Sequence, residues 1–266
     1  MQLTVAIHVE RKHTCVFEFS LVNCSSAPTT PLRFATLFSQ LRLSGTTSQI
    51  AFAPSTVPNS PRRRVEFSAD ALRDNLRRLT AVGSRSLVID LRCDAYGYGA
   101  SWVRAAAELE GCDRFLTDDN PLEPIPPTTG ELFGLSIGRP VATLIGEIVA
   151  VKSITSGESV SYGYTWTAQR TTQLALVSLG YADGVPRSGS NVASAQIGGA
   201  SVPVVGRIAM DQLVLDVTNC SVVVGDNALF WSHPDESAVW AGSATRDPLS
   251  LVAGLSWRVE REWIAE

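Results

Sequence analysis

The side chains best suited to chemistry in the first half of the chain stand in one stretch, Arg92-Cys-Asp-Ala-Tyr-Gly-Tyr-Gly99. It follows Ser86–Leu91, which is predicted as a strand, and precedes Ala100–Leu109, which is predicted as a helix that ends at Gly111. In a strand–helix unit this position is the carboxyl end of the strand, where barrel enzymes place their sites. Its glycines let a ligand approach the backbone, and the helix N-terminus can hold an anion. Taken alone, the stretch is equally a tight turn with Tyr96 packed on a neighbour.

Three further stretches carry aromatic and polar residues in the second half of the chain. Each has a simple structural explanation: an aromatic strand, a turn capped by an aspartate, and a loop that enters a strand. They are Ser161-Tyr-Gly-Tyr-Thr-Trp-Thr-Ala168, Leu179-Gly-Tyr-Ala-Asp-Gly-Val-Pro-Arg187 and Gly206-Arg-Ile-Ala-Met-Asp-Gln212. Each stretch by itself is only a weak indication of function. Their occurrence together, in this order along the chain, is much more specific.

Together, these stretches resemble alanine racemase, a pyridoxal-phosphate enzyme, over about residues 62–260. Arg64–Asn75 look like its opening strand and helix. The stretch Asp94-Ala-Tyr-Gly-Tyr-Gly99 is similar to the one that follows its Schiff-base lysine, and Gly157-Glu-Ser-Val-Ser-Tyr-Gly163 resembles the segment of its catalytic tyrosine. The other two stretches look like signatures of its C-terminal domain.

The resemblance implies a racemisation that interconverts L- and D-alanine for the bacterial cell wall, with pyridoxal 5'-phosphate as the cofactor and electron sink. In the family, a lysine and a tyrosine serve as bases on opposite faces of the substrate. The implied site residues are Tyr162 as the catalytic tyrosine, Tyr96 and Gly130 as cofactor-binding residues, and Tyr181, Met210 and Asp211 as groups presented to the partner subunit's site. A head-to-tail homodimer also follows from the resemblance.

The chain departs from the family at the lysine. The position four residues before Tyr96 holds Arg92, and a guanidinium stays protonated and has no lone pair for a carbonyl carbon. Among 22 basic residues only Lys12 and Lys152 are lysines, and neither is near the motif in the sequence. We therefore expect no stable covalent cofactor and no measurable racemisation.

A second departure is the length of the barrel. A complete (β/α)₈ barrel takes about 200–250 residues, whereas Arg62 to Phe133 is 72 residues. The family's arginine before the barrel exit has no match at Pro127–Thr129, and we expect the closing Arg-Val-Pro-Arg stretch with its tyrosine to be absent as well. The chain is either a truncated relative or a misjoined reading frame.

The composition sets the remaining limits. The net charge of −4 gives no basic excess for nucleic acid, and no run of about 18 apolar residues exists for a membrane span. Five irregularly spaced cysteines indicate reduced thiols in a cytoplasmic protein and no metal site.

The expected fold class is α/β plus all-β, a remnant of a (β/α)₈ barrel followed by an alanine-racemase-type C-terminal β-domain. Residues 1–61 are rich in Ser, Thr and Pro and are expected to be disordered, apart from a short helix over Leu32–Leu43. Residues 62–133 are assigned to the partial barrel and 134–266 to the β-domain. Two functions stay open: an impaired racemase, or a non-catalytic relative that acts as a dimerisation or binding module, as a homodimer or with an intact racemase.

Overall fold

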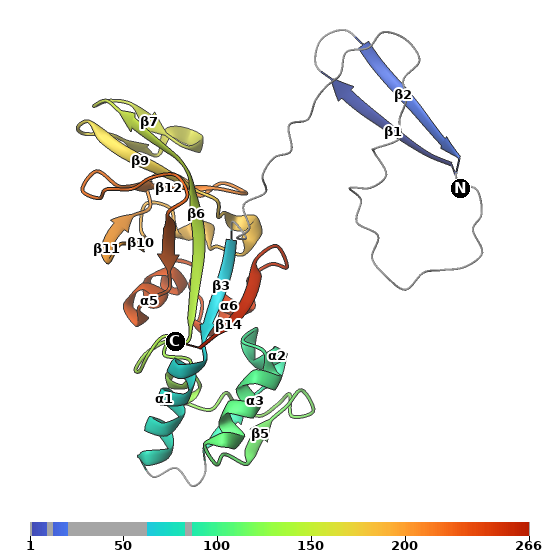
Figure 1. Ribbon diagram of the computed structural model, residues 1–266, viewed down its shortest axis with the longest axis vertical. Helices are drawn as coiled ribbons and strands as arrows, with labels where there is room; N and C mark the ends of the chain where they lie inside the picture. Colours follow the sequence, from blue (N-terminus) through green and yellow to red (C-terminus); the bar gives the residue numbers. More distant parts are fainter. Residues whose placement is uncertain (1, 10–12, 21–62, 83–86, 266) are drawn as a thin grey trace. The chain divides into compact units, whose positions relative to one another are not determined.

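The computed structural model describes residues 2–9, 13–20, 63–82 and 87–265, which fall into two compact units, residues 1–56 and residues 57–266 (Figure 1). In the first unit, β1 (Gln2–Val9) and β2 (His13–Ser20) pair as an antiparallel hairpin. The expectation of disorder over 1–61 missed this hairpin, although apolar residues alternate along β1 from Leu3 to Val9, as in a strand. Residues 21–62, with the expected helix over Leu32–Leu43, lie outside the described residues.

The second unit is organised on an eight-stranded sheet in the order β11-β10-β13-β6-β3-β14, with β9 pairing β6 and β12 pairing β9. Its strands are β3 (Arg63–Ser68), β6 (Ala142–Ile154), β9 (Thr172–Val177), β10 (Ser194–Ile197), β11 (Ala200–Pro203), β12 (Leu213–Asp216), β13 (Asn227–Phe230) and β14 (Glu260–Ile264). The strand-rich second half that the sequence predicts is therefore observed. The β10–β11 hairpin turns at Gly198-Gly199, and both glycines have positive φ.

The first strand of the α/β segment belongs to this β-sheet. β3 pairs antiparallel with β6 and parallel with β14, from the far end of the chain. The expected boundary, with 62–133 as partial barrel, is therefore misplaced at β3. The reason is that a six-residue strand followed by a helix has the same local pattern whichever sheet it joins, and the pairing partners lie far away in the sequence.

The helix α1 (Ala69–Ala81) follows β3 as the sequence predicts. Ser68 is its N-cap, because its hydroxyl accepts a hydrogen bond from the Ala71 amide at 3.0 Å. The buried face of α1 carries Asn75, whose amide nitrogen donates to the carbonyls of Leu132 and Arg139 and whose oxygen accepts from the Arg139 amide. Asn75 thereby holds the return segment that leads into β6.

The barrel-like part consists of two short parallel strands and their helices. β4 (Val88–Asp90) and β5 (Arg114–Leu116) form a two-stranded parallel sheet, and α2 (Arg92–Tyr96) and α3 (Ala100–Leu109) lie between them in the chain. Within the described residues these two strands pair with no others. Cys93 to Tyr96 all have φ between 51° and 57°, a left-handed turn that costs about 1–2 kcal/mol per residue and must be held by its surroundings.

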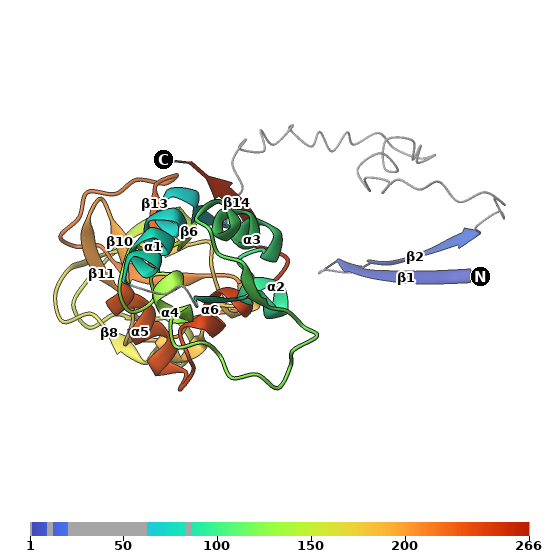
Figure 2. The ribbon, with the colours of Figure 1, turned by 90° about the horizontal axis from the view of Figure 1, so that it is seen from below.

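Shorter helices complete the unit. They are α4 (Thr129–Leu132), α5 (Pro234–Ser243) and α6 (Leu249–Ala253). An aromatic group joins the α/β segment to the sheet: Tyr98 stacks on Phe133 at 3.9 Å, and Phe67 lies 5.2 Å from Trp263 of β14. Figure 1 shows α1 and α3 below β3 and β6, and Figure 2, seen from below, has α1, α3 and α4 in front of the sheet.

Replacing Asn75 by alanine should destabilise this unit. The substitution leaves buried carbonyls and an amide without partners, so we expect the free energy of unfolding to fall by about 2–4 kcal/mol. Urea unfolding monitored by circular dichroism measures it, with the exposed Asn227→Ala as the matched control. An Asn75→Ala midpoint equal to that of the unmodified chain would contradict this account of the return segment.

Candidate functional site

Arg92, which the resemblance places at the position of the family's lysine, is fixed by a buried carboxylate. Asp90 ends β4 with no exposed side-chain surface, and both of its oxygens accept hydrogen bonds from the Arg92 guanidinium. The remaining terminal nitrogen of Arg92 donates to the carbonyls of Asn120 at 3.2 Å and Glu123 at 2.6 Å. The guanidinium thus has acceptors on both sides and joins the end of β4 to the segment 117–123.

Tyr96 is committed to the same carboxylate, because its hydroxyl donates to Asp90 at 2.7 Å. Burial would raise the pKa of Asp90, but the hydrogen bonds from Arg92 and Tyr96 outweigh it, so this pKa lies below its ordinary value. The hydrogen bond to Asp90 also raises the pKa of Arg92 further. Burial, together with the hydrogen bond to Asp90, raises the pKa of Tyr96 to about 12. All three groups therefore keep their ordinary charge states at neutral pH.

The N-terminus of α3, considered from the sequence as an anion site, already has an acceptor. The Asp94 carboxylate accepts from the Ala100 amide at 2.7 Å. A phosphate in that place would meet a fixed negative charge, so this helix end does not fit it. Gly130, the other expected cofactor residue, lies in α4, where an added Cβ would meet only Ser136 Oγ at 3.7 Å. No close approach requires glycine there.

In the described part of the chain, Lys152 is the one lysine. It is exposed near the C-terminal end of β6, where it pairs with Leu174 of β9. Arg92 follows β4, whereas Lys152 lies near the end of β6 that leads into β7. Figure 1 shows β7 and α2 well apart. Lys152 is thus not placed to serve the Arg92 site of its own chain.

Tyr162 stands at a projecting hairpin. It opens the 3₁₀ turn Tyr162–Tyr164 between β7 (Ser159–Val160) and β8 (Trp166–Thr167), and 71% of its surface is exposed. The hairpin is tied to the 206–212 loop, because the Ser161 hydroxyl donates to the Arg207 carbonyl. Gly163, with φ +73°, lies against the Arg207 guanidinium, which an added Cβ would approach at 3.0 Å.

Tyr181, Met210 and Asp211 lie on two adjoining loops. The amides of Tyr181 and Ala182 donate to the carbonyls of Ala209 and Met210, so the two loops are joined by backbone. Gly180 permits this approach, since an added Cβ would lie 2.3 Å from the Met210 carbonyl oxygen. Tyr181 and Met210 are both partly exposed on this surface.

A buried ion cluster supports these loops. Asp183, fully buried, accepts from Arg63 Nη1 and from the Gly180 amide, both at 2.9 Å, and lies 3.4 Å from Arg258 Nε. Arg258 also donates to Asp211 at 2.6 Å, and this hydrogen bond raises the pKa of Arg258. The cluster connects the start of β3, the 180–184 turn, the Asp211 loop and the segment before β14.

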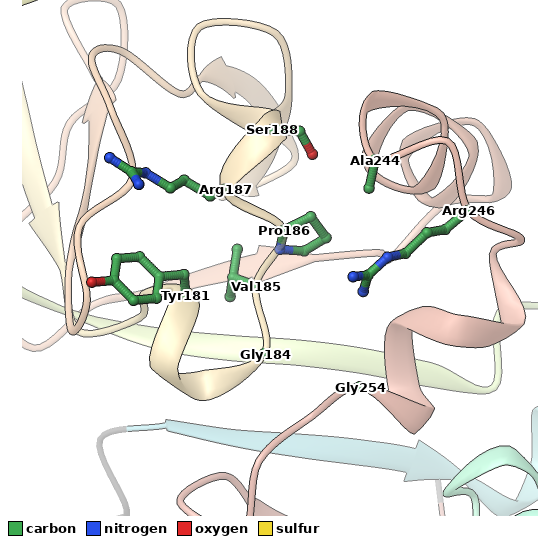
Figure 3. A pocket seen from close by; sticks show the side chains of 9 residues that line it. All are labelled: Tyr181, Gly184, Val185, Pro186, Arg187, Ser188, Ala244, Arg246 and Gly254. Carbon is green, nitrogen blue, oxygen red and sulfur yellow. The ribbon is translucent and has the colours of Figure 1, made fainter.

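A pocket of about 330 Å³ lies beside Tyr181. Its lining comes from the 181–188 segment and from the region of α5 and α6: Tyr181, Gly184, Val185, Pro186, Arg187, Ser188, Ala244, Arg246 and Gly254. Figure 3 shows that Arg187 extends toward the Tyr181 ring, whereas Arg246 approaches Pro186 from the other side. The Arg187 guanidinium is 5.7 Å from the centre of the Tyr181 ring. The two cations therefore do not converge on one point.

Sequence reasoning missed two carboxylates that organise these regions, Asp90 and Asp183. The available signal for Asp90 was an acidic residue inside the apolar stretch Leu87–Leu91, two positions before Arg92. For Asp183 the turn role was weighed, but its ion partners come from distant segments. Among the described residues no group of three His, Cys, Asp or Glu could hold a metal ion. Nor does any helix in these ranges have the length and apolar character needed to cross a bilayer.

Comparison with known proteins identifies the class. The structure aligns with the alanine racemase from Streptomyces coelicolor A3(2), with a TM-score of 0.63 and 20% identity over 77% of this chain and 98% of that one. The alanine racemase from Bartonella henselae was solved with covalently bound pyridoxal phosphate. It aligns with a TM-score of 0.62 and 14% identity over 77% of this chain and 100% of that one. At these identities the likeness establishes the fold, which is that of alanine racemases.

The sequence comparison then matches the second half of the chain. Residues 141–263 match the family model of the alanine racemase C-terminal domain. The alanine racemase of Deinococcus radiodurans is 43% identical over 127 residues, 46% of this chain and 35% of that protein. The chain contains this C-terminal β-domain and resembles alanine racemases in part, while it spans well under two thirds of the length of the curated relatives it matches.

The matched range extends close to the end of the described residues. It runs to residue 263 and so includes Arg258-Val-Glu-Arg261, which differs from Arg-Val-Pro-Arg at one position. The expected absence of the exact stretch and of its tyrosine stays a prediction. Trp263 closes the stretch, and its indole N–H donates to the Tyr98 carbonyl at 3.1 Å.

The ion cluster yields a stability prediction. Asp183→Asn removes the charge that balances Arg63 and Arg258 inside the structure, and breaking a buried pair costs about 3–5 kcal/mol. We expect the free energy of unfolding to fall by about 3 kcal/mol in urea titrations. Asp119→Asn, at an exposed position, is the control. A loss below that of the control would show that the cluster adds no stability.

Proposed function

We propose that this chain is a non-catalytic relative of alanine racemases whose β-domain associates with a racemase-type subunit. The observation that supports loss of catalysis is Arg92, with its guanidinium bound on one side by buried Asp90 and on the other by two carbonyls. A group in this state neither forms a Schiff base nor accepts a proton.

The cofactor implied by the family does not fit the residues present. Pyridoxal 5'-phosphate needs an amine for covalent attachment, and position 92 offers none. The Tyr96 hydroxyl, expected to contact the phosphate, donates to Asp90, whose charge opposes an anion beside it. No catalytic step of this chain is therefore assigned to the cofactor.

Association with a partner is supported by the surface around Tyr162. Tyr162, Tyr164, Met210 and Val192 are all more than half exposed, on loops that backbone contacts hold in place. Large exposed apolar side chains on ordered loops are typical of protein interfaces. We infer that the partner is a second copy of this chain or an intact racemase, with alanine as the substrate only in the latter case.

The first consequence is that the purified chain forms no measurable D-alanine from L-alanine. General-base catalysis is worth about 10²–10⁴-fold and the covalent electron sink supplies more, so the loss of both removes detectable turnover. Chiral chromatography of the products measures it, with an intact racemase as the positive control. Racemisation by the purified chain would refute the proposal.

Arg92→Lys tests which defect is primary. We expect this variant to stay inactive, because the ammonium would lie beside the Asp90 carboxylate and remain protonated. Borohydride treatment in the presence of pyridoxal phosphate, followed by peptide mapping, should find no pyridoxyl group on residue 92. Turnover by this variant would show that the missing amine was the main defect.

The second consequence concerns Tyr162 in a mixed dimer. When an intact racemase whose own catalytic tyrosine is changed to phenylalanine is mixed with this chain, Tyr162 should supply the missing base and raise activity about 10²-fold or more. Tyr164→Phe, two residues away and similarly exposed, is the matched control and should rescue equally. Rescue that survives Tyr162→Phe, or no rescue despite co-purification of the two chains, would contradict this role.

A further inference from the structure

The carboxyl edge of the β4–β5 sheet is where two neighbouring segments leave the strands. Because the strands are parallel, Arg92 after β4 and Thr117 after β5 emerge at the same edge. The Leu91 amide donates to the Leu116 carbonyl at 2.9 Å and extends the pairing to the ends of the strands. In α/β proteins, ligands enter at this edge.

The segment 117–123 is folded back and held by side chains from the β4 side. Arg92 donates to the Asn120 and Glu123 carbonyls, and the Cys93 amide donates to Asp118 Oδ1 at 2.9 Å. Within the segment, the Asn120 amide donates to the Thr117 carbonyl at 2.8 Å. The turn is therefore closed on itself and cross-linked to the neighbouring strand end.

The Asp90 carboxylate makes this cross-link rigid. It binds the guanidinium through both oxygens and is oriented further by the Tyr96 hydroxyl. A two-pronged contact fixes the plane of the guanidinium, which then directs its remaining nitrogen at the carbonyls of the segment. A lysine ammonium has no such plane and cannot make these contacts together.

We propose that Asp90 and Arg92 form one coupled clamp that straps residues 117–123 across the carboxyl edge of the sheet, so that this edge is closed. This inference deepens the proposed function. It rests on that proposal only where Arg92 is assigned to the position of the family's lysine. The contacts that support the clamp do not depend on any activity. The exchange experiment can therefore contradict the clamp while the chain still forms no D-alanine, and D-alanine formation would not contradict the clamp.

Hydrogen exchange of the full-length chain, followed by mass spectrometry of peptides covering 87–93 and 114–123, tests the clamp. Arg92→Gln and Asp90→Asn should each raise exchange of these peptides by about tenfold or more, since hydrogen bonds to charged groups are lost. The double variant should loosen the segment no further than either single variant. Arg73→Gln, at an exposed pair with Asp70 on α1, is the matched control.

Protection in peptides of β6 and β9 reports whether the variants remain folded. If either variant unfolds the whole unit, Tyr96→Phe tests the clamp instead, because it removes only the hydroxyl that orients Asp90. In this variant hydrogen exchange in residues 114–123 should rise while β6 stays protected. Unchanged exchange in 114–123 for the folded variants, or strictly additive effects of Asp90→Asn and Arg92→Gln, would overturn the proposal.

Discussion

The long strand β6 is the constraint on which the unit depends, because its two halves pair with different strands. Its first half pairs with β3 and β13 and its second half with β9, and a bulge at Val149 separates the two. Gly146 lies where Val177 and Leu179 cross the strand, and an added Cβ would come within 2.6 Å of both side chains. A single side chain there would separate the sheet from the 179–184 turn.

This arrangement explains which elements could be predicted from the sequence. The Ser68 cap, the helix α1 and the Gly198-Gly199 turn follow from local rules of capping, periodicity and turn geometry, and all are observed. The membership of β3 in the β-domain sheet could not be predicted, because it depends on β6 and β14, the latter nearly two hundred residues away. Strand β14, Glu260-Arg-Glu-Trp-Ile264, has too many charges to indicate a strand by composition.

In the candidate site too, some features could be predicted from the sequence and others depend on distant partners. The positions of Tyr162, Tyr181, Met210 and Asp211 on neighbouring loops were expected from a resemblance, and the structure brings the last three together; their roles stay predictions. These loops are supported by buried Asp183, which pairs with arginines from both ends of the unit. This pairing could not be predicted, because nothing in the sequence marks which of the twenty arginines would find a distant partner.

Asp90 and Arg92 depend on each other for their stability at the end of β4. A buried aspartate without a cation would be destabilised by desolvation, and a buried guanidinium without an anion equally so. Once both are present, changing either one alone leaves the other unpaired, so a substitution at position 92 carries a stability cost. The strained left-handed turn from Cys93 to Tyr96 adds to this dependence, because Asp90 holds Arg92 just before it and Tyr96 at its end. Stability at this edge thus depends on the pairing of these two residues with each other.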